Sequence, residues 1–220
     1  GHTRGTPTHT LHTSEGGSRP PASSLPSAAD SRRLNVPGEA DFANRGVSDC
    51  ATGGCPLVRG KDVLVAGGGD AAVVGALFIA KCANSIKVIH RRDEFRGVKY
   101  IQEKVFANDK IEPVWNTVVE EVEGENAVTG LRLRDVKSGE EKKLAVEGAF
   151  VLVGVTPNTE YLQGYLPMDE KGFLPTGENL ETAVAGLFVG GDVRANALRQ
   201  LAIAVGEWAL AATSADHYLG

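Results

Sequence analysis

The sequence predicts an α/β protein built around a Rossmann-like nucleotide-binding domain, and the order of features in residues 61–96 carries that prediction. A short apolar run at 63–66 leads into three consecutive glycines at 67–69. A helical pattern follows over 70–83, and a second apolar run spans 86–89. This order of strand, glycine turn, helix and strand is the βαβ unit, whose two strands are parallel neighbours in one sheet.

The glycine turn fits the dinucleotide fingerprint G-x-G-x-x-G/A through Gly67, Gly69 and Ala72. Gly67 permits the sharp turn out of the strand, and Gly69, which lacks Cβ, lets the backbone approach a pyrophosphate. Ala72 is small enough for close packing of the helix on the strand, and the free N–H groups at the helix start then face the phosphates. The alternative is a glycine-rich turn in an ordinary α/β domain, but the flanking strand and helix favour the nucleotide site.

The end of the second strand indicates which dinucleotide the site takes. It carries His90, Arg91 and Arg92, with Arg96 close behind, where a NAD site has an acid for the ribose 2′-hydroxyl. Positive side chains at this place attract a phosphate instead. The cluster therefore predicts a site for the 2′-phosphate of NADP.

Composition and charge exclude several other classes of protein. The 220 residues are 42% hydrophobic and 23% charged with a net charge of −5, which is typical of a globular protein and argues against nucleic-acid or anionic-membrane partners. No apolar run reaches the roughly 18 residues of a membrane span, and no secretory signal pattern is present. The three cysteines do not form a secreted disulfide framework, so we expect a cytoplasmic protein. We expect no metal site, because no cluster of ligand side chains supports one.

The elements beyond the βαβ unit are predicted from hydrophobic periodicity. Residues 97–107 have the spacing of an amphipathic helix. Apolar runs separated by GEN and KSGE turns predict a three-stranded antiparallel meander. The elements predicted after that helix are a strand at 111–115, the meander strands 118–122, 128–134 and 142–146, a buried strand at 149–153, a short strand at 187–189 and a long helix at 196–219.

Changes in composition divide the chain into three regions. Residues 1–33 are rich in Thr, Ser, Pro, Gly and His without an apolar period, so alone they predict a disordered tail. We place an irregular N-terminal segment at 1–36, a nucleotide-binding domain with a cysteine loop at 37–156, and a C-terminal region at 157–220. The last region has one clear strand and one long helix, which cannot close a core alone.

A series of sequence blocks resembles the low-molecular-weight bacterial thioredoxin reductases, which are class II pyridine nucleotide-disulfide oxidoreductases. The blocks follow the family's order and spacing over about residues 34–220, which makes the resemblance specific. They are LNVPGE at 34–39, RGVSDCAT at 45–52, RGKDVLVAGGGDAA at 59–72, HRRDEFR at 90–96, VWNT at 114–117, VTGLRLRDVKSGEE at 128–141, GVTPNT at 154–159, GLFVGGDV at 186–193 and RQLAIAVGE at 199–207.

The resemblance implies a domain plan and an activity. In this family an NADPH domain is inserted into a discontinuous FAD domain, and this chain resembles the NADPH domain followed by the C-terminal part of the FAD domain. Residues 1–36 would be a remnant of the N-terminal FAD part, which is otherwise missing. The implied function is an NADPH-dependent flavoprotein disulfide reductase that passes electrons from NADPH to FAD, to a cysteine pair and to thioredoxin or a similar thiol protein. At full length it would be a homodimer.

The resemblance also implies positions for both cofactors. Asp192 would hydrogen-bond the ribityl chain of FAD, with Arg199 and Gln200 along the flavin; for Asp192 alone, a turn or helix-start aspartate is an equal alternative. The residues implied for NADP are Gly67, Gly68, Gly69, Asp70, Ala71, His90, Arg91, Arg92 and Arg96. The residues implied for FAD are Gly191, Asp192, Arg199, Gln200 and Leu201.

The cysteine loop departs from the family's pattern. The family's redox centre is C-A-T-C followed by Asp, whereas here four residues separate Cys50 from Cys55 and no aspartate follows. The wider spacing still allows a disulfide but places the second sulfur elsewhere, and thiol exchange depends on that position. Cys50 and Cys55 are the predicted catalytic pair, and two ordinary thiols are the alternative. Cys82, within the first helix pattern, is expected to be a buried small residue.

This departure keeps two alternative functions open. One is a ferredoxin-type NADP flavoprotein reductase without a dithiol. The other is a catalytically impaired NADPH-binding fragment, which the missing FAD part favours. Residues 17–27 stand where relatives have an apolar strand, and a local shift of reading frame would explain their Ser, Pro and Arg content; residues 53–58 could share that origin.

Overall fold

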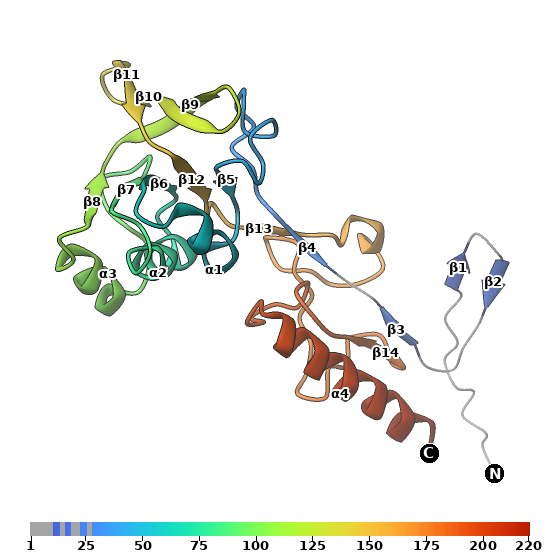
Figure 1. Cartoon of the computed structure of the whole chain (residues 1–220). Helices are drawn as coiled ribbons and strands as arrows, with labels where there is room; N and C mark the ends of the chain where they lie inside the picture. The colour runs from blue at the N-terminus through green and yellow to red at the C-terminus, as the bar shows by residue number, and fades with distance from the viewer. Residues whose placement is uncertain (1–10, 14–15, 19–22, 26–27) are drawn as a thin grey trace, which may run out of the picture. The chain divides into compact units, whose positions relative to one another are not determined.

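The computed structural model of the chain divides into two compact units (Figure 1). The central unit is Ser31–Gly154. The terminal unit combines Val155–Gly220 with the described residues up to Asp30. The structure describes residues 11–13, 16–18, 23–25 and 28–220.

The central unit is built on a five-stranded parallel sheet of order β5-β12-β6-β7-β8. The strands are β5 (Val47–Ser48), β6 (Asp62–Ala66), β7 (Ser85–Ile89), β8 (Ile111–Val114) and β12 (Gly148–Val151). Because all neighbours are parallel, the carboxyl ends of the strands share one edge, which is where open α/β sheets bind ligands. The predicted α/β class with a Rossmann-like parallel sheet is confirmed.

The two faces of this sheet are covered by different elements. One face packs against α2 (Asp70–Ile79) and α3 (Lys99–Phe106), and the antiparallel sheet lies on the other side (Figure 1). The alternation of side chains along β6 serves both faces, because Val65 joins the cluster with α2 while Leu64 joins the cluster with the antiparallel sheet. Both side chains are fully buried, as expected for the central strand of a covered sheet.

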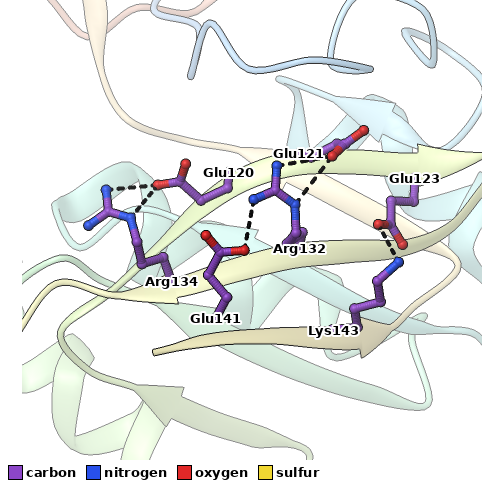
Figure 2. Close-up of polar contacts among 7 residues, drawn as sticks. All are labelled: Glu120, Glu121, Glu123, Arg132, Arg134, Glu141 and Lys143. Carbon is purple, nitrogen blue, oxygen red and sulfur yellow. Dashed lines mark hydrogen bonds and ion pairs between the residues drawn. The ribbon is translucent and has the colours of Figure 1, made fainter. Parts of the chain in front are cut away.

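The antiparallel sheet has the order β11-β10-β9, with β10 in the centre. Its strands are β9 (Thr117–Gly124), β10 (Val128–Asp135) and β11 (Glu141–Ala145), which confirms the predicted meander. Leu131 and Leu133 of β10 are buried, so the residues that alternate with them point outward. The outward arginines of β10 join charged side chains of β9 and β11 in a set of ion pairs that we name the charge ladder. In it Arg134 pairs with Glu120, Arg132 with Glu121 and Glu141, and Lys143 with Glu123 (Figure 2).

The terminal unit contains short paired strands and one long helix. Its core gathers Leu174, Val189 and Val193. The elements are β1 (Leu11–Thr13), which pairs with β2 (Gly16–Ser18), β3 (Ser23–Leu25), which pairs in parallel with β14 (Leu187–Val189), β4 (Ala29–Ser31), which pairs with β13 (Val155–Pro157), η2 (Glu160–Leu162) and α4 (Leu201–Leu219).

These strands differ from the disordered tail predicted for the first 33 residues. β3 takes its place beside β14 although its sequence is only Ser-Ser-Leu. A strand ladder is made by backbone N–H and C=O groups, so a segment without an apolar period can still pair. Residues 1–10, 14–15, 19–22 and 26–27 of the predicted tail lie outside the described residues.

Two predicted helix boundaries are wrong. α4 begins at Leu201 rather than at 196, because Asn196 has a left-handed φ of 62° that no α-helix contains. α2 ends at Ile79 rather than at 83, because the amides of Lys81 and Cys82 bond three residues back and tighten the chain into a turn. Among the described residues, no helix has the length and apolar character to span a membrane.

Candidate functional site

The glycine turn leaves β6 at the carboxyl edge of the parallel sheet. Gly67 has φ +142°, and a Cβ there would collide with the carbonyl oxygen of Leu152, so only glycine fits. Gly69 differs, because a Cβ there would meet nothing within 4 Å. The fold therefore fixes Gly67 as glycine, whereas the space beside Gly69 is open to an approaching ligand.

α2 begins directly after the turn, with its first N–H groups at the same place. Gly69 is the N-cap residue and supplies no capping side chain, and the amide of Ala72 bonds back to its carbonyl oxygen at 3.0 Å. The amides of Asp70 and Ala71 come first in the helix, where backbone N–H groups and the helix dipole attract anions. The Asp70 carboxylate is occupied elsewhere, because its Oδ1 accepts the N–H of Val98 at 2.8 Å.

Residues 90–98, which we name the arginine loop, connect the end of β7 to α3 beside the glycine turn. The Arg96 amide donates to the carbonyl oxygen of Gly68 at 2.7 Å. Gln102 of α3 donates through Nε2 to the carbonyl oxygen of Gly97 at 2.6 Å. The N–H of Val98, the last residue of the loop, donates to Asp70 of α2. These three contacts hold the loop against the turn.

The guanidinium groups of this loop carry uncompensated positive charge. Arg91, Arg92 and Arg96 are exposed, and within the described part of the chain none of them forms an ion pair. The loop has two acids, Asp93 and Glu94, and neither pairs with its arginines in the described structure. Asp93 pairs with Lys137 at 3.2 Å, and the hydrogen bond from Lys137 is the main reason that the pKa of Asp93 is lowered. Three free guanidinium groups beside a helix N-terminus form an anion site of the kind that suits phosphate.

His90 is buried, unlike the three exposed arginines of the same loop. Its side chain is 5% exposed, and a Cβ on Gly68 would collide with its ring. Burial, followed by repulsion from Arg96, Arg92 and Arg91, lowers the pKa of His90 below its usual value. Its Nε2 has no hydrogen-bond partner among the described groups. The structure thus places the predicted residue His90 behind the turn and the three predicted arginines on the surface.

The cysteine loop forms two short helices, α1 (Ala51–Gly54) and η1 (Cys55–Val58). Cys50 is the N-cap of α1: its Sγ accepts the Gly53 N–H at 3.3 Å and lies 3.3 Å from the Thr52 hydroxyl. The hydrogen bond from Thr52, followed by that from Gly53, lowers the pKa of this exposed thiol. A lower pKa means more thiolate at neutral pH, which is the nucleophilic form.

The predicted pairing of Cys50 with Cys55 is not formed in the structure. Cys55 is buried in a disulfide with Cys82, and Cys50 is free. Residues five apart in helical backbone lie about 140° apart around the axis, so the two side chains face different directions. The expectation that Cys82 is a buried small residue within the helix is wrong: it is half-buried and bonded to Cys55, because α2 ends at Ile79 and Cys82 lies in the turn beyond it.

The Gly-Gly-Asp turn after β14 is braced from α4. Gly191, at φ +85°, donates its N–H to Oε2 of Glu207 at 2.7 Å. The other carboxylate oxygen of Glu207 pairs with Arg194, and these side chains are 13% and 18% exposed. Arg194 also donates to the Thr176 hydroxyl at 2.8 Å. The sequence predictions missed Glu207, although a single acid in the apolar run 201–211 was the available signal.

The other residues predicted for the flavin lie around the same turn. The guanidinium of Arg199 lies 4.2 Å from the centre of the Phe173 ring, and its Nε donates to the carbonyl oxygen of Asp192 at 3.3 Å. Gln200 is the N-cap residue of α4 and makes no capping hydrogen bond, and Leu201 is 83% exposed. The structure therefore brings Arg199 to Asp192 and leaves Leu201 uncovered.

Comparison with protein-family models identifies one match over most of the chain. Residues 27–208 match the model described as pyridine nucleotide-disulphide oxidoreductase. Among curated proteins, thioredoxin reductase of Treponema pallidum is 41% identical over 198 residues, which is 89% of this chain and 63% of the relative. Thioredoxin reductase of Bacillus subtilis is 34% identical over 196 residues, 89% of this chain and 62% of the relative. The chain thus spans less than two thirds of the length of these relatives.

Solved structures agree with the sequence comparison. Thioredoxin reductase of Lactococcus lactis has a TM-score of 0.78 and 33% identity, over 98% of this chain and 71% of that one. Thioredoxin reductase of Giardia duodenalis has a TM-score of 0.84 and 30% identity, over 96% of this chain and 70% of that one.

Proposed function

This chain belongs to the pyridine nucleotide-disulphide oxidoreductase family, among the thioredoxin reductases, and from that premise we propose that its central unit binds NADPH. The whole protein would be an NADPH-dependent flavoprotein disulfide reductase. The observation that carries the proposal is the set of unpaired guanidinium groups of Arg91, Arg92 and Arg96 beside the glycine turn. A 2′-phosphate dianion would supply the charge partner that the described chain does not.

The pyrophosphate would lie at the start of α2. Gly67 and Gly68 shape the turn, Gly69 leaves the approach open, and the amides of Asp70 and Ala71 would donate to phosphate oxygens. One oxygen of the Asp70 carboxylate already accepts the N–H of Val98, which fixes this side chain against the arginine loop. Bound NADPH supplies a hydride.

We propose that the terminal unit contributes to a FAD site. Asp192 would bond the ribityl chain, and Gly191, Arg199, Gln200 and Leu201 would lie along the cofactor. The contact of Arg199 with the Asp192 carbonyl supports a shared role, because it fixes the turn from which Asp192 projects. The flavin supplies two-electron chemistry when bound.

The cysteine loop supports a narrower proposal than the dithiol mechanism. Cys50 is exposed and has a lowered pKa, which suits a thiol that exchanges with a partner such as thioredoxin. The Cys55–Cys82 disulfide keeps the second predicted sulfur away from Cys50. This observation favours a second candidate function, an NADPH-binding protein with impaired disulfide reduction. The proposed disulfide reductase would act in the cytoplasm and, at full length, as a homodimer.

Calorimetric titration of the full chain with NADPH and NADH tests the central claim. We expect NADPH to bind at least about tenfold more tightly, since each charge-assisted contact is worth about 1.5–3 kcal/mol. The double substitution Arg91→Ala and Arg92→Ala should reduce the preference at least about tenfold, since Arg96 remains. Arg134→Ala, which removes the same charge from the charge ladder, is the matched control and should leave the preference unchanged. Equal affinity of the unaltered chain for both nucleotides would contradict the proposal.

A visible absorption spectrum and an NADPH-driven assay with a disulfide dye separate the two candidate functions. The reductase function requires bound flavin and turnover that is lost in Cys50→Ser. A chain that binds NADPH but shows no flavin absorption and no turnover supports the binding function instead.

A further inference from the structure

The backbone around Arg96 is fixed by one side chain of α3. Gln102 donates through Nε2 to the carbonyl oxygen of Gly97 at 2.6 Å and to that of Phe95 at 3.3 Å. A side-chain amide nitrogen carries two N–H groups, so Gln102 uses both of its donors on the two residues that flank Arg96. The N–H of Arg96 itself donates to the Gly68 carbonyl oxygen at 2.7 Å. Three consecutive residues centred on Arg96 are therefore tied to α3 and to the glycine turn.

Packing on both sides of Arg96 restricts the same stretch of the arginine loop. The Phe95 ring is buried, and its centre lies 4.5 Å from that of the Trp115 ring. Gly97 lies so close to α2 that a Cβ there would come within 2.6 Å of a methyl carbon of Val73. Arg96 stands between these two buried positions and is itself exposed. Its backbone is thus held from the protein side, while its side chain is accessible to an anion.

Hydrogen bonds that fix a loop bear on binding through conformational entropy. A guanidinium on a fixed backbone loses less freedom when it pairs with a phosphate than one on a backbone that must first be ordered. Gln102 is half-buried on α3, and its amide is neutral, so it adds no charge to the attraction of the loop for an anion. Its contacts suit a role in positioning the charged group rather than in binding the nucleotide.

We propose that Gln102 is a positioning residue for Arg96, and that it sets part of the preference for NADPH over NADH by holding this guanidinium where the 2′-phosphate binds. The inference rests on the proposed NADPH site and goes beyond it, because it makes selectivity depend on a neutral residue whose donors are both used within the protein. Without the two hydrogen bonds, Arg96 keeps its charge but is ordered only as the dinucleotide binds. NADH has no 2′-phosphate, so its affinity should not depend on Gln102.

The test is a double-mutant cycle, read by calorimetry of the full chain with NADPH and with NADH. In Gln102→Met, which keeps the length of the side chain but has no donor, we expect NADPH to bind about three- to fivefold more weakly and NADH to bind unchanged. In the Arg96→Ala background the same substitution should cause no further loss, because the positioned group is gone. Gln163→Met, at an exposed glutamine of the terminal unit, is the matched control and should leave both affinities unchanged.

The outcomes distinguish this inference from the proposed function. An unaltered chain without a preference for NADPH contradicts the NADPH site itself, and the role of Gln102 falls with it. An undiminished preference in Gln102→Met, an equal loss for both nucleotides, or an equal loss with and without Arg96 overturns only the role of Gln102. If Gln102→Met does not fold, Gln102→Asn decides by the same criteria, because it retains the amide but is one methylene too short to reach both carbonyl oxygens.

Discussion

The charge ladder and the arginine loop place arginines on the surface of the same unit in opposite ways. In the charge ladder each cation meets an acid: Arg132 lies 3.1 Å from Glu121 and 3.0 Å from Glu141, and Lys143 lies 2.7 Å from Glu123 (Figure 2). In the arginine loop three guanidinium groups meet no acid of the described chain. The cations of the charge ladder have acidic partners within the protein, whereas the arginines of the loop gain a partner only when an anion binds.

The difference shows where positive charge indicates a binding site. Arginines across a strand from glutamates stabilise a sheet locally, and their field is cancelled within a few ångströms. Arginines without acids retain their field, and here they add to the N-terminus of α2. The number of arginines is thus less informative than whether their partners lie within the protein, and that distinction gives four predictions.

The largest expected effect on stability comes from removing one partner of the largely buried Arg194–Glu207 ion pair. Glu207→Ala leaves Arg194 largely buried without its partner and removes the acceptor of the Gly191 N–H. We expect the free energy of unfolding to fall by about 3 kcal/mol, the range for breaking a buried pair. Chemical denaturation followed by circular dichroism measures it. Glu178→Ala, an exposed acid of the same unit, is the control, and an equal effect of both would contradict the comparison.

Removing one unpaired charge should affect binding and leave folding unchanged. In Arg96→Ala the backbone N–H that bonds Gly68 is retained and only the guanidinium is lost. We expect NADPH to bind about tenfold more weakly, equivalent to about 1.4 kcal/mol, with NADH binding and the midpoint of unfolding unchanged. Calorimetry and thermal unfolding of the same sample give both values. A lowered midpoint with unaltered binding would assign this arginine to stability.

Cys50 extends the comparison to an exposed anion. Its thiolate is stabilised by neutral donors, the Thr52 hydroxyl first and the Gly53 amide second. In Thr52→Val the pKa of Cys50 should rise toward its usual value, so the thiolate fraction at neutral pH falls and alkylation by iodoacetamide slows several-fold. The measurement is the alkylation rate of Cys50 as a function of pH, read by mass spectrometry. An unchanged profile would remove the assigned cause of the lowered pKa.

The smallest effect is expected in the charge ladder. Lys143 pairs with Glu123 but its side chain is 73% exposed. Lys143→Ala should change the free energy of unfolding by no more than about 0.5 kcal/mol, since exposed pairs are screened by water and salt. Denaturant titration at low and high salt checks this. A loss of more than about 1 kcal/mol in the free energy of unfolding would contradict this prediction and show that the exposed ion pairs of the charge ladder stabilise the sheet.

The sequence predicts the central unit well because its signals are local. The run into Gly67, the helix after it and the strand that ends at Ile89 are adjacent in the chain, and the meander is set by hairpin turns. The arginine cluster is equally local, so its position beside the turn follows from the βαβ unit alone. The start of the long helix is predicted wrongly although a local signal is present. Asn196 is of the residue type that most readily adopts a left-handed conformation outside glycine, but the helical periodicity around it masks this signal.

The parts that could not be predicted depend on contacts between distant segments. The bond of Cys55 to Cys82 requires the position of the turn after α2 relative to η1. The role of Glu207 depends on a turn that lies 16 residues earlier in the chain. The burial of His90 requires knowing that Gly68 faces its ring. Periodicity specifies which side of an element is apolar, but it does not specify which distant atom faces a given side chain.

The link between Cys55 and Cys82 closes a covalent ring across 27 positions, and this ring contains β6, the whole glycine turn and α2. A protease that cuts inside the ring therefore produces two peptides that remain tied together until a reductant is added. Cleavage at any bond outside the ring releases its fragments at once. Peptide maps with and without reductant would thus outline the nucleotide-binding segment without any ligand being present.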